Sequence, residues 1–208
     1  MKRFLSTEPE VQLEKAFANP FKSIITTART CYSSKGVIRE EDLREGSEAL
    51  AESLYMAGHH TTIQHAHFQF SIANVSRQFI WSFLHSHPFY NSEQVSQRYV
   101  AVKPGSFAIP PIGGESLEIY TRTIEMQMDG YRRLTELLTP IVEREYRRIF
   151  PHRDMKEKKY RNAVVKRALE VARYALPIAT FAYLYHTISA LTLLRYYRPC
   201  SGLDRRQQ

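Results

Sequence analysis

The most informative part of the chain is Ser96-Gln97-Arg98-Tyr99-Val100, which follows a segment crowded with histidine and serine. We expect residues 97–108 to form a strand, so that Ser96 and Arg98, two residues apart, point to the same side. A hydroxyl and a guanidinium placed side by side are suited to bind one phosphate group. The stretch therefore predicts a nucleotide site, and the alternative is a solvated polar turn.

Three other segments accompany this stretch along the chain. They are Thr27-Ala28-Arg29-Thr30-Cys31-Tyr32, then Gly58-His59-His60-Thr61-Thr62-Ile63-Gln64-His65 with Phe68-Gln69-Phe70-Ser71-Ile72 and Val75-Ser76-Arg77 behind it, and finally Ala172-Arg173-Tyr174-Ala175-Leu176-Pro177-Ile178-Ala179-Thr180. The four segments span residues 27 to about 187. In composition and order they resemble the flavin-dependent thymidylate synthases.

This resemblance implies a fold, an activity and an assembly. The fold class is α/β (α+β), with a central, mostly antiparallel sheet and long flanking helices. The implied activity is methylation of dUMP to dTMP with methylenetetrahydrofolate and NADPH as cosubstrates and FAD as cofactor. The chain contains no G-x-G-x-x-G segment, so the FAD site is not expected to be a Rossmann fold. The family works as a homotetramer whose sites are shared between subunits.

The same resemblance assigns roles to individual residues. The flavin-binding residues it implies are Cys31, His59, Thr61, His85, Ser86 and His87. The dUMP-binding residues it implies are Ser96, Gln97, Arg98 and Arg173. Arg198 is the candidate for the late arginine that activates the substrate.

Two departures from the family pattern bear on activity. The family's R-H-R segment corresponds here to His85-Ser86-His87, and its late arginine falls on Cys200, with Arg198 two positions earlier. Imidazoles carry little charge at pH 7 and hold phosphates weakly. The alternative function is therefore a divergent, non-methylating member of the family, which binds nucleotide or flavin or serves as partner subunit to a complete copy.

Composition sets independent bounds on the architecture. A chain of 208 residues with 43% hydrophobic residues predicts one domain over residues 1–208, with a helical excursion at about 115–175. The formal charge of +8 favours anionic partners such as nucleotides. Ten basic residues between 144 and 167 fit a solvated helix face, and because no nucleic-acid motif is present, nucleic acid is not an expected partner.

Export, membrane insertion and metal binding are not expected. The sequence has no apolar run of about 18 residues and no apolar signal core, which favours a cytoplasmic protein. Cys31 and Cys200 are expected to be free thiols. Six histidines between 59 and 87 offer a zinc site as an alternative, but no cysteine or carboxylate completes an obvious ligand set. No metal site is therefore predicted.

Hydrophobic periodicity predicts the helices and the remaining strands. Helices are expected at residues 41–56, 78–84, 115–148 (one kinked helix or two), 156–175 and in a final segment to about 198, and strands at 68–73, 97–108 and 178–187.

Overall fold

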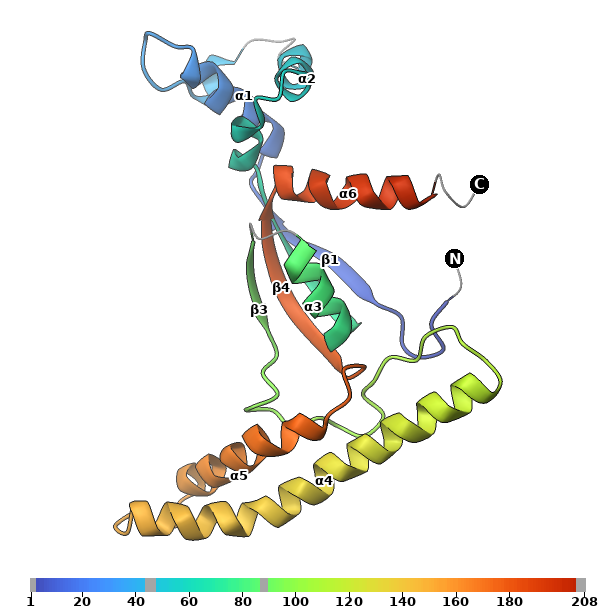
Figure 1. Ribbon diagram of the computed structural model, residues 1–208. Coiled ribbons are helices and arrows are strands. Elements are labelled where there is room, and N and C mark those ends of the chain that lie inside the picture. The colour runs from blue at the N-terminus through green and yellow to red at the C-terminus, as the bar shows by residue number, and fades with distance from the viewer. Residues whose placement is uncertain (1–2, 44–47, 87–89, 205–208) are drawn as a thin grey trace. The chain divides into compact units, whose positions relative to one another are not determined.

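The computed structural model describes residues 3–43, 48–86 and 90–204, with side chains omitted at 48 and from 198 onward. The strands are β1 (Glu10–Ala16), β2 (His67–Ser76), β3 (Asn91–Gln94) and β4 (Phe181–Ser189). The α-helices are α1 (Pro20–Cys31), α2 (Glu48–Met56), α3 (Arg77–Ser86), α4 (Glu115–Ile149), α5 (Lys158–Ala172) and α6 (Ala190–Asp204) (Figure 1). Three short 3₁₀ helices are η1 (Glu40–Asp42), η2 (His60–His65) and η3 (Arg173–Ala175).

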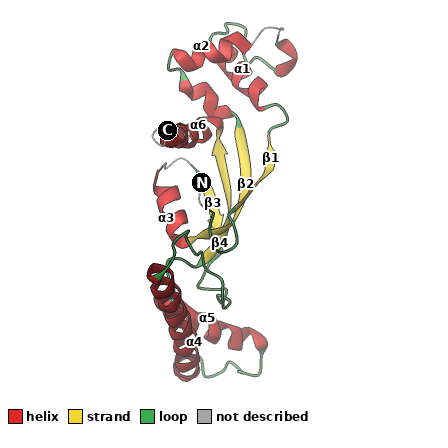
Figure 2. Cartoon of the chain, turned by 90° about the vertical axis from the view of Figure 1, so that its right-hand side faces the viewer, coloured by secondary structure: helices red, strands yellow, loops and turns green. Residues whose placement is uncertain are grey.

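The four strands form one antiparallel sheet in the order β1-β2-β4-β3 (Figure 2). Side chains join the strands in register: the Ser71 hydroxyl donates to Glu14 at 2.6 Å, and the Gln69 amide donates to Thr187 at 3.2 Å. At the β3 edge the amide of Val95 donates to the carbonyl of Tyr183 at 3.1 Å. The mixed α and β class with an antiparallel sheet, expected from the sequence, is confirmed.

The chain divides into two compact units. The first contains residues 1–10, 73–81 and 94–183, and the second contains residues 11–72, 82–93 and 184–208. The first unit holds α4 and α5, which pack along each other (Figure 1). Its cores contain Phe107, Ile124 and Ala179 in one cluster and Tyr131, Leu169 and Ala172 in another.

The second unit is built around α1. Asn19 caps this helix, because its side-chain oxygen accepts from the amide of Lys22 at 3.1 Å, and Pro20 begins it with a backbone angle suited to a first turn. The buried Ile25 and Ala28 lie on the face that packs against η2. This arrangement places His59 beside Tyr32, at the C-terminal end of α1.

The prediction of a strand at residues 97–108 is wrong. The strand in this region is β3, which ends at Gln94. Residues after Ser96 form a turn instead, because the amides of Tyr99 and Val100 both donate to the carbonyl of Ser96 at 3.1 Å. Further along, Phe107 makes only an isolated bridge with Thr180.

The other helix and strand boundaries differ from the predicted ones for local reasons. The expected helix at 41–56 begins at Glu48, since residues 40–42 form η1, where the carboxylate of Asp42 accepts from the amide of Arg39 at 2.9 Å. The last strand begins at Phe181, because both the amide and the hydroxyl of Thr180 donate to Pro177 and form a turn. The segment 115–149 is a single helix despite Pro140.

Strand β1 was not expected from the sequence. All seven of its residues are exposed, so it carries no alternation of buried and exposed side chains. Of the described helices, none is long and apolar enough to cross a membrane.

Candidate functional site

The turn that begins at Ser96 belongs to the first unit and carries three of the predicted substrate residues. The Ser96 hydroxyl accepts from the amide of Arg98 at 3.4 Å, so serine and arginine are close through a turn rather than through a strand. The guanidinium of Arg98 lies 4.0 Å from the carboxylate of Glu170 on α5, and its side chain is 49% exposed. Arg98 is therefore held near α5 and remains accessible to a ligand.

Arg173, the fourth predicted substrate residue, meets the same glutamate. Its Nε donates to the backbone carbonyl of Glu170 at 3.1 Å, and its guanidinium lies 5.2 Å from the ring centre of Tyr174. Glu170 also pairs with Arg167, one turn earlier on α5. The structure thus brings Arg98 and Arg173 to one residue of α5, although 75 positions of sequence separate them.

A third arginine, Arg77 at the start of α3, joins this group. Its guanidinium donates to the side-chain oxygen of Gln94 at 2.6 Å and to the carbonyl of Val95 at 3.4 Å. Burial, followed by the nearby positive charge of Arg173, lowers the pKa of Arg77. We refer to Arg77, Arg98 and Arg173 as the arginine cluster. The Glu170 carboxylate contacts one of these three guanidiniums, that of Arg98, so the cluster keeps an excess of positive charge that suits a phosphate.

Gln97 adds a hydrogen-bond donor beside the arginine cluster. Its side-chain nitrogen is buried and has no hydrogen-bond partner within the described parts of the chain. A buried donor without an acceptor costs free energy, which a bound polar group would recover. Ser96, Gln97, Arg98 and Arg173, which were all predicted, therefore belong to one polar region with Arg77 and Glu170, which were not.

Three of the predicted flavin residues lie in the second unit, on α1, η2 and the residue before η2. Cys31 is an exposed free thiol at the end of α1. His59 bonds through Nδ1 to the hydroxyl of Tyr32 at 3.3 Å, and Thr61 is exposed on η2. A cavity of about 810 Å³ lies beside Tyr32, and its charged lining residues are Arg29, Lys35 and Asp42. Two basic side chains against one carboxylate leave a net positive charge, and a cavity of this size fits an anionic dinucleotide.

The remaining predicted residues are placed less fully. His85 and Ser86 are exposed at the end of α3, where the Ser86 hydroxyl donates to the carbonyl of Phe83 at 2.7 Å. His87 and the side chains of Arg198 and Cys200 lie outside the described residues. Their roles stay predictions.

A buried histidine was missed by the sequence reasoning. His186 on β4 is 1% exposed, and its Nδ1 lies 2.5 Å from the hydroxyl of Ser92. The ring of Phe83 lies 4.8 Å away, and the hydroxyl of Tyr196 lies 3.4 Å from Nε2. Burial lowers the pKa of His186 to about 4. The signal was available, because His186 occupies the same alternate positions along the strand as the apolar Leu184 and Ile188.

Metal binding finds no support in the described ranges. No three residues among the histidines, cysteines, aspartates and glutamates described there lie close enough together to hold a metal ion.

Comparison with known proteins decides the family. The family described as "Thymidylate synthase complementing protein" matches residues 12–201. The chain belongs to this family. The match covers both units, and the resemblance found in the four sequence segments is confirmed.

Individual relatives of this family member are named flavin-dependent thymidylate synthases. The chain is 29% identical over 196 residues to "Flavin-dependent thymidylate synthase" of Clostridium tetani, covering 91% of this chain and 73% of that protein. It is 26% identical over 201 residues to the protein of that name from Nitratidesulfovibrio vulgaris, covering 92% and 74%.

A solved structure shares the fold of this family member. It is the UMP/dUMP methylase PolB from Streptomyces cacaoi bound with 5-Br dUMP, with a TM-score of 0.61. The two sequences are 17% identical, and the match covers 88% of this chain and 74% of PolB. At this identity the likeness shows the fold alone.

Proposed function

We propose that this family member is a flavin-dependent thymidylate synthase, which methylates dUMP to dTMP with methylenetetrahydrofolate and NADPH through FAD. The observation that carries the proposal is the arginine cluster beside the side-chain nitrogen of Gln97, which is buried and has no hydrogen-bond partner among the described residues. This arrangement offers charge for a phosphate and a hydrogen-bond donor for a neutral polar group. The family and the names of the relatives support the choice of dUMP.

In this proposal the protein works mainly by positioning its substrate. Arg98 and Arg173 bind the phosphate of dUMP, and the Ser96 hydroxyl adds a further hydrogen bond. Gln97 donates to the sugar or base, and Arg198 supplies a cation near the uracil ring. Holding the reacting groups in a fixed orientation reduces the entropic part of the barrier, so no protein nucleophile is needed.

The residues near α1 suit FAD. The basic side chains of Arg29 and Lys35 at the 810 Å³ cavity would bind its phosphates, and Cys31, His59 and Thr61 would contact its ring system. When bound, FAD supplies hydride transfer from NADPH. His85, Ser86 and His87 remain the proposed counterparts of the family's R-H-R segment.

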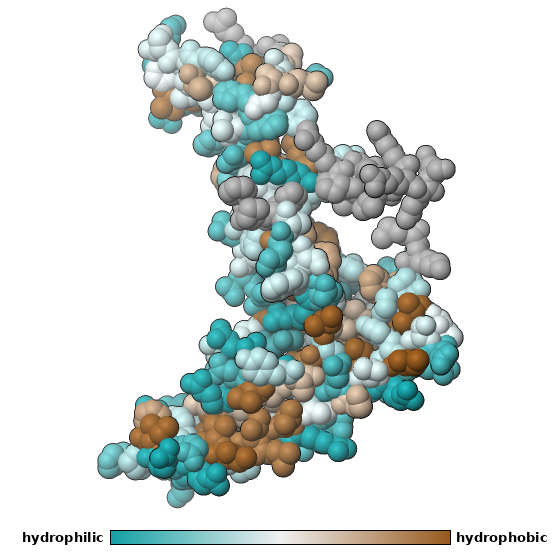
Figure 3. All heavy atoms as spheres, in the orientation of Figure 1, coloured by the Kyte–Doolittle hydropathy of each residue, from teal (hydrophilic) through white to brown (hydrophobic). Residues whose placement is uncertain are grey.

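We also propose a homotetramer with shared sites, in the cytoplasm. On α4 the apolar residues Leu134, Leu137 and Ile141 recur along one stripe and are 40%, 65% and 46% exposed. Figure 3 shows apolar side chains gathered over α4 and α5. Such a surface on a folded chain indicates a protein contact. Light scattering at micromolar concentration should give a mass near four times 24.3 kDa, and a monomeric mass would remove the shared-site proposal.

A second candidate function is a non-methylating member that binds nucleotide or flavin, or completes a site with another family copy. The observation that favours it is the sequence His85-Ser86-His87, which supplies no permanent charge where the family has two arginines. Weaker flavin binding is the expected consequence.

Product analysis separates the two candidates. Purified protein is mixed with dUMP, methylenetetrahydrofolate, NADPH and added FAD, and dTMP is measured by chromatography. We expect dTMP to form, and we expect flavin bands in the visible spectrum after unbound FAD is removed. A protein that binds dUMP but makes no dTMP, alone or with FAD, would contradict the synthase and favour the second candidate.

A further inference from the structure

The first unit contains a cavity whose lining includes none of the residues assigned above to dUMP or FAD. Its volume is about 590 Å³, and it lies between the loop of residues 101–107, one face of α4, and Leu169 of α5. Its walls are mainly apolar and include Val102, Phe107, Met128 and Leu169. A volume of this size and an apolar lining are typical of small-molecule sites.

The loop that closes the cavity is fixed to α4. The hydroxyl of Tyr131, a residue 5% exposed, accepts from the amide of Val102 at 3.3 Å. Tyr131 packs in the core cluster with Leu169 and Ala172, and Val102 packs against that cluster. Because both ends of this contact are anchored, the cavity is a preformed space, and a ligand would not have to order the loop.

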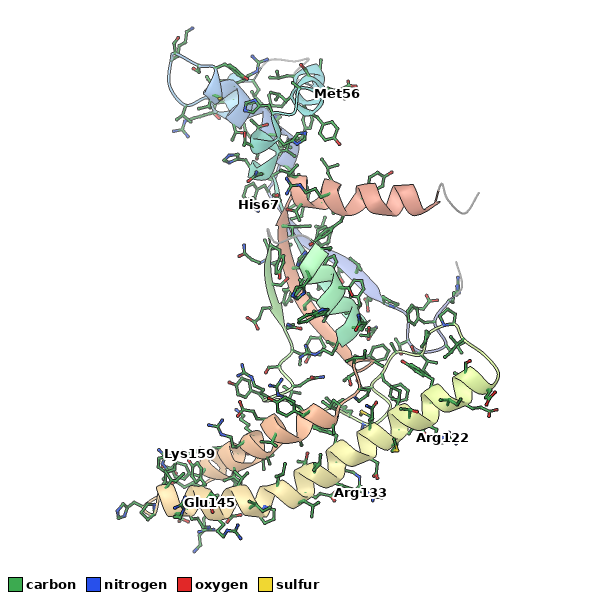
Figure 4. All side chains as sticks on the ribbon, viewed as in Figure 1. Met56, His67, Arg122, Arg133, Glu145 and Lys159 are labelled. Atoms are coloured by element: carbon green, nitrogen blue, oxygen red, sulfur yellow. The ribbon has the colours of Figure 1, made fainter. Side chains whose placement is uncertain are left out.

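The charged side chains at the cavity indicate which sign of charge a ligand would carry. Arg132 bonds to Asp129 at 2.7 Å and to Glu136 at 2.8 Å, and Arg133 bonds to Asp129 at 2.6 Å. These four side chains satisfy one another. Figure 4 labels Arg133 on α4.

Glu125, one turn before Asp129 on α4, also lines the cavity. Within the described residues it has no ion-pair partner, so the charge left uncompensated at the cavity is negative. The chain as a whole carries a formal charge of +8. The negative charge at this cavity is therefore opposite in sign to the charge of the whole chain and of the arginine cluster.

We propose that this cavity binds a planar aromatic molecule that carries one positive charge. The aromatic body buries against Met128, Phe107 and Leu169, where apolar contact supplies most of the affinity. The positive group pairs with Glu125 at the rim and selects cations over anions. A nucleotide, which is anionic, is excluded by the same charge, so this site and the arginine cluster take ligands of opposite sign.

Fluorescence titration of the full chain tests the proposal with two probes. Berberine, a planar aromatic cation, should bind at one site per chain, and 8-anilinonaphthalene-1-sulfonate, an aromatic anion, should bind there at least tenfold more weakly. Glu125→Gln should weaken berberine binding about tenfold and strengthen binding of the anion, because the repelling charge is removed. The matched control is Glu118→Gln, an exposed carboxylate on the same helix, which should change neither.

A second variant tests the location. Met128→Trp fills the apolar part of the cavity and should remove berberine binding, while circular dichroism reports whether the variant folds. Excess dUMP should not displace berberine. Absence of berberine binding to the parent protein, equal binding by Glu125→Gln, or displacement by dUMP would each overturn the proposal.

Discussion

Replacing Arg98 with alanine is expected to weaken dUMP binding by about 2 to 4 kcal/mol, which is roughly a 30- to 700-fold rise in Kd. The loss is large because the substitution removes a charge-assisted pair between a guanidinium and a phosphate. The Glu170 carboxylate, 4.0 Å from Arg98 in the parent protein, would remain near the site, still paired with Arg167. Isothermal titration calorimetry with dUMP measures the change directly.

The matched control for this prediction is Arg122→Ala. Arg122 is exposed on α4, in the same unit but outside the arginine cluster (Figure 4). The Arg122→Ala substitution lowers the net charge by the same amount as Arg98→Ala, so a nonspecific electrostatic effect would appear in both variants. Equal dUMP affinity in Arg98→Ala and in the parent protein would contradict the assignment of the Ser96 turn to the phosphate.

Acidification is expected to destabilise the second unit through His186. Its pKa is about 4 in the folded chain, below the unperturbed value of about 6.5, because burial disfavours the charged ring. The folded state therefore binds fewer protons than the unfolded state between these values. The stability that His186 contributes is present above pH 6.5 and is lost as the pH falls toward 4. The expected loss is about 2 kcal/mol between pH 7 and pH 5, and about 3 kcal/mol by pH 4.

Urea denaturation at pH 7 and pH 5 checks this prediction. His186→Phe keeps an aromatic ring among Phe83, Tyr90 and Tyr196 but cannot titrate, so its unfolding free energy should depend less on pH by about 2 kcal/mol over this range. His152→Gln, at an exposed histidine, serves as control and should behave as the parent protein does. An unchanged pH dependence in His186→Phe would show that another group carries the effect.

Local sequence patterns were sufficient for β2 and α4. The alternation from Phe68 onward marked β2, and the apolar spacing from Glu115 marked α4. They failed for β1, whose residues are all exposed, and for residues 97–108. There, Tyr99 and Val100 have strand propensity, but their amides bond to the carbonyl of Ser96 and close a turn. Two backbone hydrogen bonds therefore determine the conformation here, and the strand propensity of these residues does not.

The candidate site was only partly visible in the sequence. Arg98 and Arg173 were found through a family resemblance, but their meeting at Glu170 depends on the packing of α5 and on the turn that follows β3. Glu170 itself has the spacing of an ordinary helix ion pair with Arg167, so nothing in the sequence set it apart. Arg77 was visible as the residue that starts a helix, whereas its position beside Arg173 is a tertiary feature.

The central claim is that the arginine cluster binds the phosphate of a pyrimidine nucleotide. Calorimetric titration of the parent protein with dUMP and with 2′-deoxyuridine, at the same pH and ionic strength, tests it most directly. The two ligands share the base and the sugar and differ in the phosphate. We expect dUMP to bind at least a hundredfold more tightly than 2′-deoxyuridine, in keeping with the loss of a charge-assisted contact of about 3 kcal/mol. Equal affinity for the two ligands, or no binding of dUMP, would contradict the account.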